Sequence, residues 1–72
     1  MPEIVFDESV NAAYIYVGAR IEKRAVERTK PLLELDNGMI NLDFDADERL
    51  VGIELIPASQ FLRPEDIERA VP

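Results

Sequence analysis

The residues best suited to chemistry are four carboxylates in the second half of the chain. Asp43, Asp45 and Asp47 stand at alternate positions, and Glu54 follows eleven residues after Asp43. These offsets are positions 1, 3, 5 and 12 of a calcium-binding loop, in which oxygen ligands surround one ion. Position 6 of such a loop is a glycine that allows a sharp turn, but this chain has Glu48 there.

The segments on either side of these carboxylates do not suit a calcium loop, which lies between two helices. Residues 39–44 and 50–56 alternate apolar and polar side chains, which is typical of strands. We therefore predict a solvent-facing strand that leads into an acidic turn at 43–47, with no bound metal and no cofactor. A small ligand-binding or metal-binding protein that uses this turn is the alternative function.

Asp7 and Asn11 flank the first turn-prone segment. Their oxygen atoms could ligate a metal or hold a substrate. Asp and Asn side chains in turns commonly accept hydrogen bonds from nearby backbone N–H groups instead. We predict this structural role for both residues.

Composition leaves little room for catalysis. The chain has no His and no Cys, which excludes the triads and zinc sites that depend on them. A hydroxyl nucleophile such as Ser9 or Ser59 would need a lysine or a carboxylate as its base. We predict a non-catalytic protein with no catalytic residues, and an enzyme of unknown reaction is a further alternative.

The charge balance limits the choice of partner. Lys and Arg number 8 and Asp and Glu number 15, which gives a net charge of −7. This excess of acid disfavours nucleic acid as a partner. Five of the bases lie within residues 20–30, whereas the charged residues within 34–54 are seven acids and one base. We predict that the acidic side chains steer a basic protein partner, and this acidic steering face comprises Asp43, Asp45, Asp47 and Glu54.

The pattern of apolar residues predicts the elements that position these groups. Alternation with period two predicts strands at about 4–6, 13–17, 40–44 and 51–55. Segment 19–30 has helix-forming residues, but its charges also suit an exposed edge strand, which we predict. The tripeptide Asp36-Asn37-Gly38 predicts a tight turn.

The C-terminal part of the chain changes character after Pro57. Pro64 is followed by two acids, and Arg69 follows later, as expected for a short helix. We predict an α+β fold, a single antiparallel sheet of about five strands in meander-like order with a short C-terminal helix. One domain would span residues 1–72, with the sheet at about 3–56 and the helical segment at about 58–71.

A sheet this small has apolar side chains on both faces. Tyr14 and Tyr16 would lie on one side of predicted strand 13–17, opposite the other apolar residues of that strand. One face packs on the core of the domain, and the other requires the C-terminal helix, a second subunit or a partner. We predict a homodimer or a protein partner, and a monomer whose helix covers the tyrosines is the alternative. The predicted interface comprises Tyr14, Tyr16, Phe61, Leu62 and Ile67.

No segment indicates a membrane protein. The N-terminal residues lack a basic leader followed by an apolar core, and no apolar run is long enough to span a bilayer. The lack of cysteine fits a reducing compartment. We expect a cytoplasmic protein without membrane contact.

Two motifs carry a resemblance to a known family. Residues 7–15, Asp-Glu-Ser-Val-Asn-Ala-Ala-Tyr-Ile, provide the first, and residues 42–55, an aspartate-containing turn followed by Val-Gly-Ile-Glu-Leu, provide the second. Together with Ala58-Ser59, they resemble the signature of a family of small prokaryotic proteins, the domain of unknown function numbered 2283. The resemblance covers about residues 3–62.

The chain departs from the family pattern at two positions. Asn11 stands where the family usually has Asp, and Glu48 stands where a turn glycine is common. The resemblance implies an antiparallel sheet with residues 19–32 as a strand. It also implies an antitoxin-like role, because such genes occur beside genes for proteins that resemble ribonuclease-type toxins.

Overall fold

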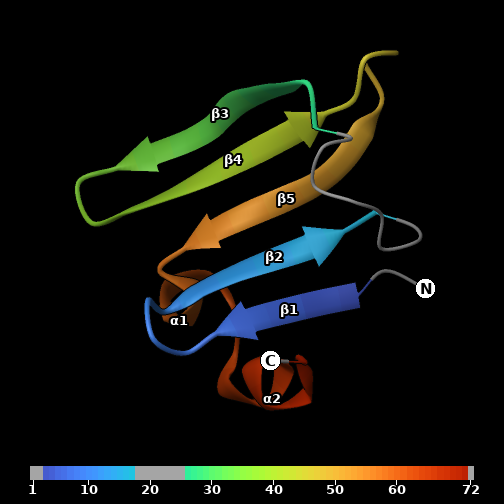
Figure 1. Ribbon diagram of the computed structural model, residues 1–72. Coiled ribbons are helices and arrows are strands. Elements are labelled where there is room, and N and C mark those ends of the chain that lie inside the picture. The colour runs from blue at the N-terminus through green and yellow to red at the C-terminus, as the bar shows by residue number, and fades with distance from the viewer. Residues whose placement is uncertain (1–2, 18–25, 72) are drawn as a thin grey trace.

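The computed structural model describes residues 3–17 and 26–71 (Figure 1). Five strands form one antiparallel sheet with the order β1-β2-β5-β4-β3. Two short helices follow the last strand, so the predicted α+β fold with a meander-like sheet is confirmed. The elements are β1 (Glu3–Asp7), β2 (Ala12–Tyr16), β3 (Arg28–Leu35), β4 (Gly38–Phe44), β5 (Leu50–Ile56), α1 (Ala58–Phe61) and α2 (Pro64–Arg69).

The edge strand lies later in the chain than the sequence predicts. Strand β3 is Arg28–Leu35 rather than 19–30, and residues 19–25 of that prediction lie outside the described part of the chain. The tight turn predicted at Asp36-Asn37 is confirmed and connects Leu35 to its cross-strand partner Gly38. This turn sets the register of the hairpin, so pairing with β4 extends β3 as far as Leu35.

Cross-strand pairing sorts the side chains of the sheet onto two faces. One row across the sheet is Ile4, Ile15, Ile53, Leu42 and Lys30. The helices pack on the face that contains this row, and we call it the helix face. The opposite row is Val5, Tyr14, Glu54, Asn41 and Pro31, and we call its side the tyrosine face.

The core of the domain lies between the helices and one half of the helix face. Ala13 on β2, Leu55 on β5 and Ala58 on α1 form its buried centre. Half-buried residues on the sheet and the helices pack around that centre, among them Phe61, Leu62 and Ile67. Figure 1 shows both helices beside β1, β2 and β5, away from β3.

The C-terminal helical segment is divided into two helices rather than one. Leu62 and Arg63 have extended backbone angles, with ψ of 146° and 152°. Pro64 disfavours a helical conformation in the residue that precedes it, so the chain straightens before α2 begins. Beyond α2, Val71 pairs with β1, its N–H donating to Ile4 and its carbonyl accepting from Phe6. In residues 3–17 and 26–71, no helix has the length and apolar character needed to cross a bilayer.

Candidate functional site

The tyrosine face carries a connected group of polar side chains. Tyr14 on β2 donates its hydroxyl hydrogen to Asp43 Oδ2 on β4, at 2.6 Å. Thr29 on β3 donates to Asp43 Oδ1, also at 2.6 Å. Nearby, Asn41 Nδ2 donates to Glu54 Oε1 at 3.1 Å. Both predicted steering carboxylates on this face therefore already accept hydrogen bonds from neighbouring strands.

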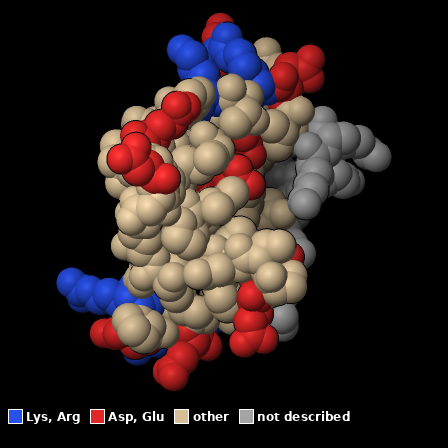
Figure 2. All heavy atoms as spheres, turned by 90° about the vertical axis from the view of Figure 1, so that its left-hand side faces the viewer, with Lys and Arg blue, Asp and Glu red and all other residues tan. Residues whose placement is uncertain are grey.

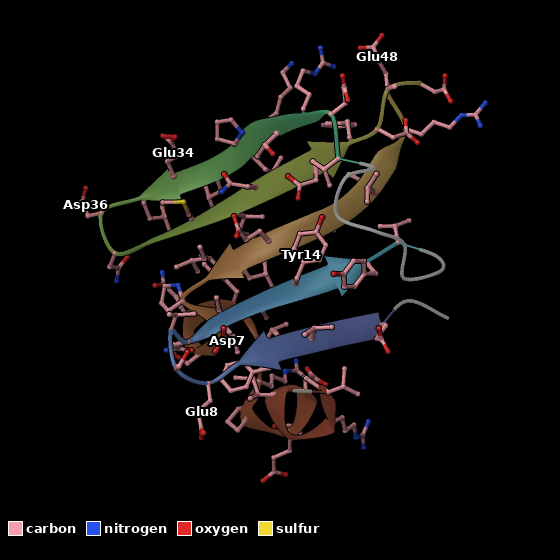
Figure 3. The ribbon with its side chains drawn as sticks, in the orientation of Figure 1. Asp7, Glu8, Tyr14, Glu34, Asp36 and Glu48 are labelled. Atoms are coloured by element: carbon pink, nitrogen blue, oxygen red, sulfur yellow. The ribbon has the colours of Figure 1, made fainter. Side chains whose placement is uncertain are left out.

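Gly52 on β5 allows the Tyr14 ring to reach across the sheet. A Cβ atom on residue 52 would lie 2.5 Å from Tyr14 Cζ, so only glycine fits beneath the ring. Figure 3 shows the Tyr14 ring over β5. Burial, and then the hydrogen bond and charge of Asp43, hold the pKa of Tyr14 well above its usual range, so the phenol stays a donor.

The residues of the first turn act within the fold. Asp7 Oδ1 accepts from the backbone N–H and the hydroxyl of Ser9, at 3.0 and 2.6 Å. Asn11 has a φ of 50° and joins the turn to α1: its Oδ1 accepts from Ser59 N and its Nδ2 donates to Ser59 Oγ. The backbone carbonyl of Asn11 also accepts from Ala58 N at 2.7 Å. The hydrogen bonds of Asp7 match the predicted role within the turn, whereas Asn11 holds Ser59 of α1 and not the backbone of its own turn.

The acidic turn between β4 and β5 is organised around Asp45. Its Oδ1 accepts from the backbone N–H groups of Asp47 and Arg49, at 2.9 and 3.0 Å. Glu48 has a φ of 62°, and its carboxylate accepts from Arg28 Nη2 at 2.8 Å. Glu48 therefore has a left-handed backbone, a conformation that glycine adopts without steric cost.

The four carboxylates with calcium-loop spacing do not surround one point. Asp43 and Glu54 lie on the tyrosine face, Asp45 closes its own turn and Asp47 is exposed. Among residues 3–17 and 26–71, no group of three or more His, Cys, Asp or Glu side chains is placed to hold a metal ion. The pairing of β4 with β5 separates these side chains, as strands do and a calcium loop does not.

The predicted interface residues fall on two different surfaces. Tyr14 and Tyr16 lie on the tyrosine face, where their rings pack edge to face with centroids 4.7 Å apart. Phe61, Leu62 and Ile67 instead pack against the core on the helix face. The helices do not cover the tyrosines, because the turn after β5 directs α1 onto the opposite side of the sheet.

The structure reveals an apolar surface that the sequence analysis did not single out. On the helix face, β3 and β4 carry neighbouring apolar side chains beyond the helices, and we call these residues the open half-face. It comprises Leu33, Leu35, Ile40, Leu42 and Phe44, and Ile40 forms its border because it also packs against the core. Leu33 and Leu35 are 41% and 46% exposed, and the other three are half-buried.

A signal for this surface was present in the sequence. Residues 32–35 read Leu-Leu-Glu-Leu and follow the segment predicted as an edge strand. Figure 2 looks onto the end of the sheet with the β3–β4 turn and shows uncharged atoms there, with acidic and basic side chains around them. Glu34 and Asp36 belong to this end of the sheet (Figure 3).

The fold and these side chains define a class of protein: a small α+β domain with one twisted sheet, helices on half of one face and a hydrogen-bonded polar group on the other. The chain belongs to the family described as "Protein of unknown function (DUF2283)", whose model matches residues 3–59. No curated protein and no solved structure matches the chain. The family assignment made from the two motifs is confirmed.

Proposed function

We propose that this chain is a non-catalytic protein-interaction module whose binding surface is the open half-face. The observation that carries the proposal is the exposure of Leu33 and Leu35 beside three half-buried apolar neighbours. A contiguous apolar area on a small protein is typical of a surface that another polypeptide covers. Its position on regular strands gives a partner a rigid platform.

The energetic balance of a small domain supports a covered surface. Few apolar side chains are buried among the described residues, and these are Ala13, Tyr16, Val51, Leu55 and Ala58. Burying apolar area contributes about 25 cal/mol per Å², and a core this small roughly balances the entropy of the chain. A partner on the open half-face would add to the same apolar layer and stabilise the fold.

The engagement of the polar groups supports a binding role over a catalytic one. Asp7 and Asp45 accept backbone hydrogen bonds within their own turns. Asp43 accepts from Tyr14 and Thr29, and Glu54 accepts from Asn41. These contacts hold the strands and turns in register and give each of these carboxylates a structural role.

We propose that the partner is a basic protein encoded beside this gene, which would make the chain antitoxin-like. The net charge of −7 supports this choice, because it attracts a basic partner over a distance without requiring all acids on one face. The exposed acids Glu34, Asp36 and Asp47 lie at the ends of β3, β4 and β5, outside the apolar area.

The experiment is a binding measurement with the purified product of the neighbouring gene, by calorimetry at low and high salt. We expect binding that weakens with salt and is reduced at least about tenfold by the double change Leu33→Gln and Leu35→Gln. Val10→Gln is the matched control, because Val10 is 62% exposed in the first turn, outside the open half-face. Equal binding by all three proteins would contradict the proposed surface, and no binding by any would contradict the proposed partner.

A further inference from the structure

We propose that, in the protein free of its partner, the open half-face is covered by a second copy of this chain, so that two sheets pack face to face along their β3–β4 halves. This inference rests on the proposed function and names the occupant of the same surface. Shape, charge and the nature of the sheet edge support a second copy on this surface when no other protein is bound.

The helix face has two levels, because helices cover one half of it and leave the other half uncovered. Helix α1 and the core occupy the β2–β5 half, and Ile40 on β4 packs against the core at its border. Leu33 on β3 and Leu42 on β4 lie on the half beyond them. A helix layer is about 10 Å thick, and two packed sheets lie about 10 Å apart. A second copy related by a two-fold axis parallel to the strands fits this two-level shape. Its β3–β4 half packs on the open half-face of the first copy, and its helices lie beside the β3 edge of the first copy.

The two-fold axis makes the contact self-complementary, as closed symmetric dimers require. Apolar side chains of one half-face then meet the same set on the other copy. Strands in stacked sheets stay nearly aligned, with a small rotation from the sheet twist. The dimer therefore has a central two-sheet layer with a helical flank on each side, and it encloses Leu33 and Leu35.

The distribution of charge favours self-association at this surface. In a chain with a net charge of −7, the open half-face contains no carboxylate, so two acidic copies repel each other least there. The bases Arg28 and Lys30 extend the same face of β3, next to Glu48.

The β3 edge disfavours the other common route to a dimer, in which edge strands pair into one continuous sheet. Pro31 lies in the middle of β3 and has no N–H to donate to a new strand. The register also shifts between Pro31 and Leu33, which interrupts the regular spacing of backbone groups. The copies are therefore joined through side chains on the face and not through backbone hydrogen bonds.

The size of the surface sets the expected affinity. A standard specific interface buries about 800 Å² per partner, and the open half-face lies on two strands only. We therefore expect a reversible dimer that dissociates in the micromolar range and leaves the tyrosine face accessible.

The test is sedimentation velocity of the full chain from about 1 µM to about 1 mM. We expect wild type and Val10→Gln to shift from monomer to dimer over this range. The double variant Leu33→Gln with Leu35→Gln should dimerise only at concentrations at least about tenfold higher than wild type requires. Thermal melts of each variant confirm that it is folded. If the double variant is unfolded, Leu35→Gln alone replaces it, because the exposure of Leu35 allows a polar side chain.

The outcomes separate this inference from the proposed function. A wild type that stays monomeric throughout, or a folded half-face variant that dimerises like wild type, would overturn the second-copy proposal. If wild type is monomeric and the same variant loses binding to the neighbouring gene product, the half-face serves that protein and the proposed function stands. If the variant changes neither property, both proposals are wrong.

Discussion

The substitution Gly52→Ala tests how the tyrosine face is assembled. The new methyl group would overlap the Tyr14 ring, whose hydroxyl is held by Asp43 at 2.6 Å. Overpacking costs about 1–3 kcal/mol, and the ring can escape only by weakening a hydrogen bond to a charged acceptor. Replacing a strand glycine by alanine recovers about 0.5–1 kcal/mol of backbone entropy. We expect a net loss of about 2 kcal/mol, which lowers Tm by roughly 8–16 °C in a domain of this size.

A double-mutant cycle followed by thermal unfolding measures this coupling. In a Tyr14→Ala background the space above residue 52 is open, so Gly52→Ala should become neutral or slightly stabilising, a coupling of about 2 kcal/mol. Tyr14→Phe is the matched control, because the ring remains but is free to swing away, and the cost should be intermediate. An equal cost of Gly52→Ala in wild type and in Tyr14→Ala would refute the reasoning.

Three further predictions concern the turns and the tyrosine. Glu48→Gly should stabilise the protein by about 0.5–1 kcal/mol in denaturant unfolding, because φ is 62° there and the ion pair lost is exposed; a loss of stability would show that the ion pair matters more than the backbone. Asn11→Ala should cost about 1–2 kcal/mol, since it removes two hydrogen bonds to Ser59 at a φ of 50°, and Asn11→Gly should cost less; the reverse order in thermal melts would contradict this. Because the pKa of Tyr14 is raised in the folded state above the ordinary 10.0, stability should be constant just below pH 10 and fall as pH rises above it. Unfolding measured against pH should show a shallower alkaline decline in Tyr14→Phe, and an unchanged slope would contradict the raised pKa.

Much of the fold could be predicted because its strands alternate locally. Ile4 with Phe6, Ile40 with Leu42, and Ile53 with its neighbours mark β1, β4 and β5 without reference to the rest of the chain. The position of β3 could not be read in this way. The helix-forming composition of 19–30 obscured it, and its end is set by the turn and by pairing with β4.

The placement of the helices depends on contacts distant in sequence. Both faces of β2 are apolar, so periodicity alone does not show which face the helices cover. Tyr14 settles the choice, because its hydroxyl needs a partner and finds Asp43 across the sheet, 29 residues away. Ala13 is small enough to lie beneath α1, where it is 2% exposed. The open half-face follows from this choice, so the sequence alone could not locate it.

The two departures from the family pattern illustrate what a single sequence can and cannot tell. Asn11 and Glu48 are the described non-glycine residues with positive φ. Both residues adopt a left-handed backbone conformation in a turn. The residue type alone suggests this conformation for an Asn, but it does not suggest it for a Glu. Reading the carboxylates by spacing suggested a cation loop, whereas the register of β4 and β5 shows that Asp43 and Asp45 serve different parts of the sheet.

The most direct test of the central claim is a methyl NMR spectrum of the full chain with labelled Leu, Ile and Val, recorded as protein concentration rises and again with the neighbouring gene product. We predict shifts concentrated on Leu33, Leu35, Ile40 and Leu42, with Val10 unchanged. Chemical-shift changes centred on other residues would contradict the claim that this protein is bound at the open half-face. The absence of changes both at rising protein concentration and with the neighbouring gene product would contradict it as well.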